Sequence, residues 1–263
     1  MKKTIFILLA TSIFNSNSMN CLIKQSLENR EPEFLDKNFN TVLHSYILLG
    51  FKDFEACKKI IENCPYINFQ NTGGTTALEC AIRKCAEEES EINSFYLQVI
   101  EELLKNKKLD INLQNFEQES YLHIASRILW KNKTLKYLVI IMLLNKGIDI
   151  NLQCQHGWTP CMWVLQIEEE YVFKLLFNLN KINIKTHSNL KGSLLHIAVE
   201  RGFENLVLKF LELGADVNAK NYLNQTNVTP LQVAIYQRNL RKQFSIDKKF
   251  ENIEKILREA GAQ

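Results

Sequence analysis

Proline and glycine are scarce in this chain, which has four prolines and nine glycines among 263 residues. That scarcity excludes long collagen-like regions and long Pro/Gly-rich disordered regions. An excess of charge of one sign is lacking too, because 32 Lys and Arg stand against 29 Asp and Glu, a formal net charge of +3. Nucleic-acid-binding domains concentrate basic residues on one face, so this balance argues against a nucleic-acid partner.

Motifs that carry chemistry are also missing. The sequence contains no G-x-G-x-x-G or G-x-x-x-x-G-K-[ST] loop, no acid–base pair and no nucleophile with an orienting histidine. Cys154, His156 and Cys161 are residue types that bind zinc, but they lack a fourth ligand. We therefore expect no catalysis, no cofactor and no metal site.

Residues 1–18 are typical of a secretory signal peptide. Lys2 and Lys3 precede an apolar run that starts at Ile5, and small polar residues follow up to Ser18, where we place the cleavage. The run is too short to span a bilayer, so we expect no membrane span after cleavage. Two alternatives stay open, an uncut leader and a lipid anchor on Cys21. A working leader implies a periplasmic or secreted protein, and an unused one implies a cytoplasmic protein.

The stretch 193–221 shows the unit from which the rest is built. Ser193 is a candidate N-cap, and Gly202 a candidate helix stop. The first helix predicted between them is apolar on most sides, through Leu194, Leu195, Ile197 and Ala198. A second helix follows, with Leu206, Val207, Phe210 and Leu211 as its apolar residues and Gly214 after its end. One such hairpin leaves an apolar face in water, so it needs stacked copies.

The same pattern recurs along most of the chain. It opens at Thr41, Thr76, Ser120, Thr159, Ser193 and Thr229, and it closes at Asn68, Asn112, Asn151, Asn183 and Asn218. It resembles the ankyrin repeat family, whose units open on T-P-L-H-x-A and close on G-A-D-V-N-A at a β-turn. The resemblance implies an all-α fold, an ankyrin-repeat solenoid of stacked helix–turn–helix units with β-turn fingers.

The repeats set the predicted domain boundaries. Residues 19–38 form an N-terminal capping segment, and 39–263 form the repeat domain, with units at about 39–70, 71–114, 115–153, 154–187, 188–221 and 222–263. Extra residues fall between the two helices of a repeat, including Glu87 to Glu89 in the second and Arg238 and Lys248 in the sixth. They are either solvated spacers or a second contact edge. The glycine that ends the second helix is replaced by Cys64, Lys108 and Leu179, which predicts strained or differently angled joints.

Histidines and cysteines receive structural interpretations. His44, His123 and His196 occupy the histidine position of the ankyrin opening, where the resemblance implies a local hydrogen bond at the helix start. Seven cysteines are present, and we expect free thiols, with Cys80 as a small buried apolar residue. Free thiols fit poorly with export to an oxidising compartment, and the sequence leaves that conflict open.

The resemblance implies protein partners that lie along a concave side formed by the β-turns and the first helices. The candidate contact residues at the turns are Gln70, Asn71, Gln114, Asn115, Phe116, Gln153, Gln155, His156, Trp158, Lys185, His187, Lys220 and Tyr222. The glutamines would form a row of amides, and Phe116, Trp158 and Tyr222 would be anchors. The alternative is that the amides only satisfy their own turns. Trp130 and Trp163 are expected within helices, as packing residues.

Two functions follow from these expectations. The first is a non-catalytic, monomeric scaffold that binds partner proteins through the concave face of an ankyrin stack and is exported as a host-interaction factor. The second is a structural or self-associating envelope protein.

Overall fold

The computed structural model describes residues 38–89, 94–167, 170–177, 181–189, 191–221, 227–242 and 248–263. The predicted signal peptide and nearly all of the predicted capping segment lie outside these residues. The chain divides into two compact units, unit 1 up to Ile148 and unit 2 from Asp149 onward. None of the helices in these ranges is both long and apolar enough to cross a membrane.

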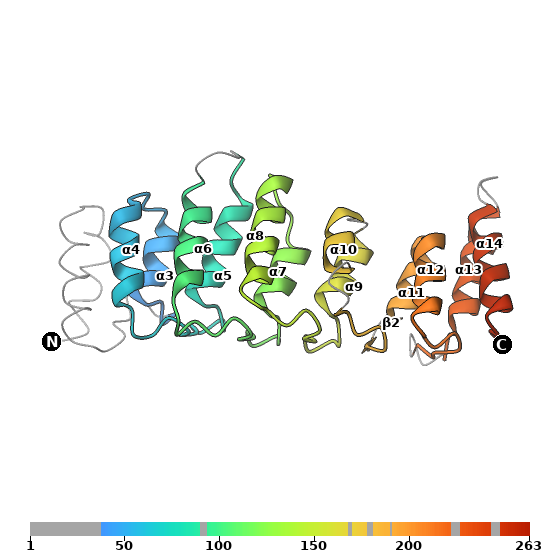
Figure 1. The fold of residues 1–263 in the computed structure, drawn as a ribbon. Helices are drawn as coiled ribbons and strands as arrows, with labels where there is room; N and C mark the ends of the chain where they lie inside the picture. The colour runs from blue at the N-terminus through green and yellow to red at the C-terminus, as the bar shows by residue number, and fades with distance from the viewer. Residues whose placement is uncertain are drawn as a thin grey trace. The chain divides into compact units, whose positions relative to one another are not determined.

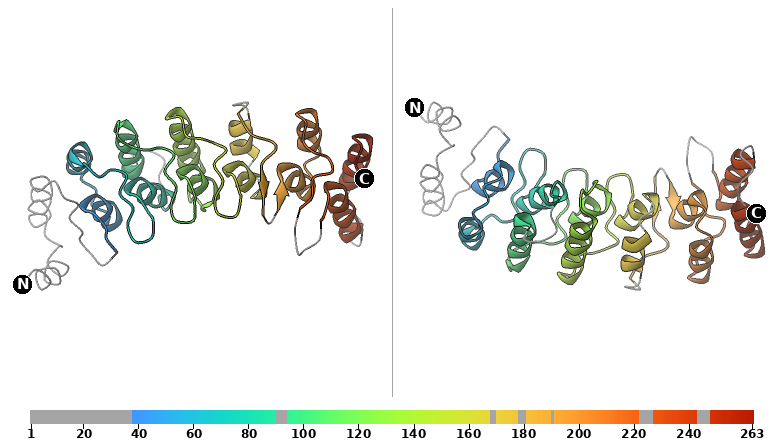
Figure 2. Two further views of the ribbon diagram at one scale, coloured as in Figure 1. Left: turned by 90° about the horizontal axis from the view of Figure 1, so that it is seen from below. Right: turned by 90° about the horizontal axis from the view of Figure 1, so that it is seen from above.

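The described residues of unit 1 form three helical hairpins. They are α3 (Val42–Leu49) with α4 (Phe54–Asn63), α5 (Ala77–Ala86) with α6 (Phe95–Lys105), and α7 (Tyr121–Arg127) with α8 (Lys133–Asn145). The first helices α3, α5 and α7 contact one another in sequence, and so do the second helices α4, α6 and α8 (Figures 1 and 2). The hairpins therefore stack as two rows of helices.

Unit 2 repeats this arrangement. Its hairpins are α9 (Pro160–Gln166) with α10 (Glu170–Phe177), α11 (Leu194–Arg201) with α12 (Glu204–Glu212), and α13 (Pro230–Lys242) with α14 (Lys248–Glu259). The first helix α11 packs between α9 and α13. A short antiparallel ribbon of β1 (His187–Ser188) and β2 (Gly192–Ser193) leads into α11, with His187 opposite Ser193. The mainly helical fold predicted from the sequence is confirmed.

The predicted opening residues begin the first helices. Thr41, Thr76 and Thr159 each accept a hydrogen bond from a backbone N–H in the first turn, whereas Ser120 and Ser193 form capping boxes with a histidine. Gly202 ends α11 with φ of 73°, in the left-handed region that a residue with a Cβ rarely adopts. The start and stop signals predicted for this repeat are thus confirmed.

Burial follows the pattern of the sequence. In α11 the side chains of Leu194, Leu195, Ile197, Ala198 and Val199 are all fully buried, as expected for a helix that is apolar on most sides. The second helix α12 buries only Val207 and Phe210, so one of its faces is packed and the opposite face is exposed to solvent. Each core therefore lies between the two rows of helices.

Three of the closing asparagines, Asn68, Asn151 and Asn218, join successive repeats through backbone atoms. Asn68 donates from Nδ2 to the carbonyl oxygen of Lys108 at 2.8 Å and accepts at Oδ1 from the amide of Asp110 at 2.8 Å. Asn151 makes the equivalent pair of bonds with the backbone of Lys181 and Asn183, and Asn218 makes it with the backbone of Gly261 and Gln263. At these three positions the closing asparagine is therefore a joint between repeats.

Helix ends without glycine are not strained. Cys64 ends α4 in an extended conformation with φ of −76°, and Asn106 ends α6 with φ of −64°. Neither of these ends needs a left-handed residue, so the expected strain at Cys64 and Lys108 is wrong. Leu179, the third replaced position, lies outside the described residues. Trp130 differs from expectation too: it lies between α7 and α8, where its Nε1 donates to the carbonyl oxygen of Ala125 at 3.0 Å.

The extra residues between the two helices adopt different structures in the sixth and the second repeat. In the sixth repeat they lengthen the helices, since α13 has 13 residues where α11 has eight. In the second repeat they form a connection that is bound to neighbouring repeats. Glu89 pairs with Lys131 at 3.0 Å and accepts at its carbonyl oxygen from Asn132 at 3.2 Å, and Glu88 lies 3.8 Å from Lys52. Glu87 and Glu89 are exposed, so this connection is solvated and also bonded to neighbouring repeats.

Candidate functional site

The loops between hairpins carry the predicted contact residues, and we call these loops fingers. The second finger is residues 68–76, the third 112–120, the fourth 151–159, the fifth 183–193 and the sixth 218–229, each numbered by the repeat it opens. Within each unit the fingers leave from one end of the helices (Figure 1). Tyr222, predicted at the sixth finger, lies outside the described residues.

The glutamines hold the fingers together. Gln70 Nε2 donates to the carbonyl oxygen of Gly74 in its own finger at 2.9 Å and to that of Gln114 in the next finger at 2.8 Å. Gln153 repeats this arrangement, with the carbonyl oxygens of Gly157 at 2.8 Å and His187 at 2.9 Å. Gln114 donates to the carbonyl oxygen of Gln118. Both amide hydrogens of Gln70 and of Gln153 are thus used inside the fold.

The asparagines shape the turns from within. Asn71 Oδ1 accepts from the amides of Gly73 and Thr75, both at 3.0 Å, while its Nδ2 donates to Asn40 at 2.8 Å. Asn115 Oδ1 accepts from the amides of Glu117 at 3.0 Å and Glu119 at 2.9 Å. These bonds form Asx turns, the local role that the sequence offered as the alternative to partner contact.

Phe116 stands apart from these internal roles. Its side chain is 66% exposed. Its ring lies over Gly74, because a Cβ on Gly74 would be 2.6 Å from Phe116 Cγ and 2.8 Å from Cδ1. The second finger therefore supports one side of an aromatic ring whose remaining surface faces solvent.

Trp158 is not an exposed anchor, so that prediction is wrong. The residue is 6% exposed, and its ring packs against Trp163 of α9 with centroids 4.5 Å apart. Trp158 directly precedes the N-cap Thr159, and its side chain points back toward α9, where it is held by packing. Trp163 lies in a helix, as expected.

The remaining candidates of unit 2 are exposed. They are Gln153, Gln155, His156, Lys185, His187 and Lys220. His187 and Lys220 line one recess of about 540 Å³ between the fifth and sixth fingers, together with Asp216. A second recess of about 680 Å³, next to Phe203 at the start of α12, contains none of the predicted residues.

The three repeat histidines are structural, as predicted. His196 is 2% exposed, its Nδ1 accepts from the Ser193 amide at 3.3 Å, and its Nε2 donates to the Val228 carbonyl oxygen at 3.1 Å. Burial lowers the pKa of His196 to about 4. His44 joins Thr41 and Thr75 in the same way, and His123 caps α7 through Ser120. These imidazoles are positioned to hold backbone, with no substrate-facing surface.

The six cysteines in the described ranges are free thiols, as expected. Burial raises the pKa of Cys57, Cys80 and Cys85 to about 12, with an added contribution from a neighbouring carboxylate in each case. Cys80 is 3% exposed, which confirms its role as a buried apolar residue. In the described part of the chain, no three His, Cys, Asp or Glu side chains are grouped to hold a metal ion.

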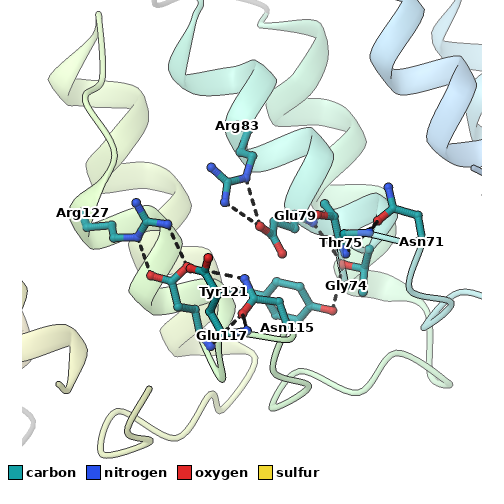
Figure 3. A network of polar contacts seen from close by, with 12 residues as sticks. Asn71, Gly74, Thr75, Glu79, Arg83, Asn115, Glu117, Tyr121 and Arg127 are labelled. Carbon is teal, nitrogen blue, oxygen red and sulfur yellow. Dashed lines mark hydrogen bonds and ion pairs between the residues drawn. The ribbon is translucent and has the colours of Figure 1, made fainter. Parts of the chain in front are cut away.

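A polar network between the second and third repeats was missed by the sequence interpretation (Figure 3). Arg83 donates from Nε and Nη2 to Glu79 Oε1, at 3.0 and 2.7 Å, and Arg127 donates from Nη2 to Glu119 Oε2 at 2.8 Å. Thr76 joins the two repeats through a 3.1 Å hydrogen bond to the Tyr121 hydroxyl. The signal was Glu79 itself, a carboxylate at the position where sister repeats have histidine.

The two carboxylates of this network differ electrostatically. Burial raises the pKa of Glu79, and the Arg83 guanidinium offsets only part of that rise. Burial acts in the same direction on Glu119, but the hydrogen bonds and charge of Arg127 outweigh it and lower the Glu119 pKa. Glu119 is therefore the carboxylate that stays charged most readily.

The geometry defines a class of protein. Within each unit, stacked helical hairpins, turn fingers and buried histidine caps make a quasi-one-dimensional array, in which each repeat contacts the next. Residues 122–221 match the family described as ankyrin repeats, in three copies. This segment is therefore similar to ankyrin repeats, and the described residues have the ankyrin-repeat fold. Proteins of this family generally mediate protein–protein interactions and are typically non-catalytic.

Known proteins resemble the chain in sequence or in fold. A fowlpox virus (strain NVSL) protein, named as an ankyrin repeat protein, is 29% identical over 139 residues, which are 53% of this chain and 68% of that protein. The ankyrin repeat domain of Bcl-3 matches with a TM-score of 0.63 and 20% identity, over 93% of this chain and 99% of that domain. A domain from Acinetobacter baumannii AYE matches with a TM-score of 0.61 and 21% identity, over 84% and 98%.

Proposed function

We propose that this protein is a non-catalytic scaffold that recognises partner proteins through its fingers and first helices. The observation that carries the proposal is Phe116, which is 66% exposed on a finger and supported by Gly74. Rigid aromatic side chains dominate many protein interfaces, since they bury a large area at a small cost in side-chain entropy. A ring already held in place binds with a smaller ordering cost than a free one.

Affinity capture with matched variants tests this proposal. Phe116→Ala should remove the partners that the unaltered chain captures, while Leu129→Ala should keep them. Leu129 is the matched control because it is 96% exposed in the same unit but lies between α7 and α8, away from the fingers. Circular dichroism melting should show both variants folded. Retention of every partner by Phe116→Ala would remove this residue from the binding surface.

Export is part of the proposal and has its own test. The leader of residues 1–18 supports it, with Lys2 and Lys3 before an apolar run. Intact mass spectrometry of the protein from its native cell should show a chain that begins at Met19. A mass that matches all 263 residues contradicts cleavage, and an added lipid mass on Cys21 would point to an anchored form. The same measurement reports whether the thiols are oxidised.

The monomer and the self-associating envelope protein differ in mass in solution. We propose the monomer, for which size-exclusion chromatography with light scattering should give no more than 30.6 kDa, the mass of one complete chain. A concentration-dependent multiple of the single-chain mass would favour self-association.

A further inference from the structure

We propose that the third finger selects a cationic side chain, Lys or Arg, of the partner protein. This inference rests on the proposed binding function and adds the chemistry of the partner residue that meets Phe116. It follows from three features of the third finger: the supported ring, an uncompensated carboxylate beside it, and a turn that is fixed before binding.

The ring provides the first feature. One side of Phe116 is occupied by Gly74, whose φ of 69° and missing Cβ let the backbone approach the ring. The side chain is otherwise 66% exposed, so a partner group can lie against it. The face of an aromatic ring carries negative electrostatic potential, which attracts ammonium and guanidinium groups.

The charges of the finger provide the second feature. Arg127 lies within electrostatic reach of two carboxylates, Glu119 and Glu117. It is bound by Glu119, which accepts from both Nε and Nη2. The hydrogen bond with Glu119 raises the pKa of Arg127, and burial lowers it. The charge of Glu117 also raises this pKa. Glu119 is 6% exposed, whereas Glu117 is exposed and has no ion pair within the described ranges.

Neighbouring charges do not cancel this excess. Arg83, the other arginine of the network, is bound to Glu79 and forms a pair that is neutral by itself. Two carboxylates thus share one guanidinium at the third finger, which leaves one negative charge, at the exposed Glu117 next to Phe116. A partner cation satisfies that charge, whereas a partner carboxylate is repelled by it.

The backbone provides the third feature. Asn115 Oδ1 holds the Glu117 amide at 3.0 Å, and the Gln118 amide donates to the Asn115 carbonyl oxygen at 2.8 Å. Gln118 itself adopts φ of 58°, which is uncommon for a residue with a side chain. The finger therefore presents Phe116 and Glu117 from a turn that is already closed, so little order has to be gained on binding.

A peptide titration followed by NMR tests the selection. The probes are the capped pentapeptides Gly-Ala-Arg-Ala-Gly, Gly-Ala-Gln-Ala-Gly and Gly-Ala-Glu-Ala-Gly, added to the full-length protein. Phe116 ring signals are assigned by their loss in Phe116→Leu. The Arg peptide should shift these signals saturably and bind more tightly than the Gln peptide, by about two- to fivefold from the exposed cation–π contact and by a further contribution from the charge of Glu117. The Glu peptide should bind more weakly than both.

Two carboxylate variants complete the test. Glu117→Gln should reduce the preference for the Arg peptide by about two- to fivefold, the size expected for an exposed ion pair. Glu251→Gln, at an exposed position of α14 in unit 2, should leave the preference unchanged. Equal binding of the Arg and Gln peptides, no shift with any peptide, or an unchanged preference in Glu117→Gln overturns the inference. If Phe116→Ala still loses the captured partners in that case, the proposed scaffold function stands without this selectivity.

Discussion

His196 Nε2 donates a hydrogen bond to the carbonyl oxygen of Val228 at 3.1 Å, and so ties the fifth repeat to the sixth finger. The Ser193 amide donates to Nδ1 of the same ring, which fixes the proton on Nε2. One neutral imidazole therefore caps its own helix and holds the next loop. Protonation of Nδ1 would break the cap, and burial already disfavours the charged ring.

Stability should depend on pH through His196. Its pKa is lowered from 6.5 to about 4 in the folded state by burial, so the unfolded state binds the proton first as pH falls. Stability should be highest above pH 6.5 and should decrease between pH 6.5 and 4, by about 3 kcal/mol in total for this residue. Urea unfolding at a series of pH values measures the change.

The control for this prediction is already present in the chain. In the sixth repeat Gln232 holds the Thr229 amide with its side-chain oxygen at 2.9 Å and cannot titrate. His196→Gln should keep the helix cap and lose the pH-dependent part of the stability. A variant with the same pH dependence as the unaltered protein would contradict the assignment to His196.

Leu195→Ala should lower the free energy of unfolding by about 2–5 kcal/mol, because it leaves a cavity in the core. Leu195 is fully buried in α11. Leu213→Ala removes the same atoms from a residue that is 51% exposed, and it should change stability by less than about 1 kcal/mol. Chemical denaturation of the two variants provides the comparison, and equal effects would contradict the register of the fifth repeat.

Gly74→Ala should destabilise the second finger more than Gly214→Ala destabilises the end of α12. Both glycines have positive φ, 69° and 84°, so each substitution costs about 1 kcal/mol in backbone strain. Only at Gly74 does the new Cβ meet another residue, Phe116. The difference in melting temperature isolates this steric contact, and the Phe116 ring signals should move in Gly74→Ala alone.

Thiol reactivity should follow burial. Cys57, Cys80 and Cys85 are all 3% exposed or less, and their pKa of about 12 leaves almost no thiolate at neutral pH. Iodoacetamide should therefore leave them unmodified in the native protein within a time that labels all three after unfolding in urea. Labelling of Cys80 in native protein at the unfolded rate would show that its repeat opens readily.

The fold was predictable because the repeat signals are local and recur in register. Ser193, Gly202 and the apolar run between them determine one helix, and the neighbouring copies determine the next. The finger glutamines were harder, because whether a turn residue faces solvent or the adjacent finger depends on a contact 34 or 44 residues away. The support of Phe116 by Gly74 is a contact of this kind, since the two residues are 42 positions apart. Trp158 packs against Trp163 only five positions later, but the sequence pattern does not indicate toward which side of the turn its ring points.

The charge at the third finger was hidden for a different reason. Glu79, Glu117 and Glu119 look alike in the sequence, and only their burial and their arginine partners distinguish them. Arg83 lies four residues from Glu79 and is expected to pair with it on a helix. Arg127 lies eight residues from Glu119 across a helix start, a pairing that no simple spacing rule identifies.

Asn68, Asn151 and Asn218 bind main-chain atoms of the following repeat, as Asn68 does with Lys108 and Asp110. These hydrogen bonds do not depend on the side chain of the residue that is bound. Lys108 can therefore replace the family's glycine without loss of the bond to Asn68. Surface residues can then differ from repeat to repeat, and new binding specificities can evolve while the hydrogen bonds between repeats stay the same.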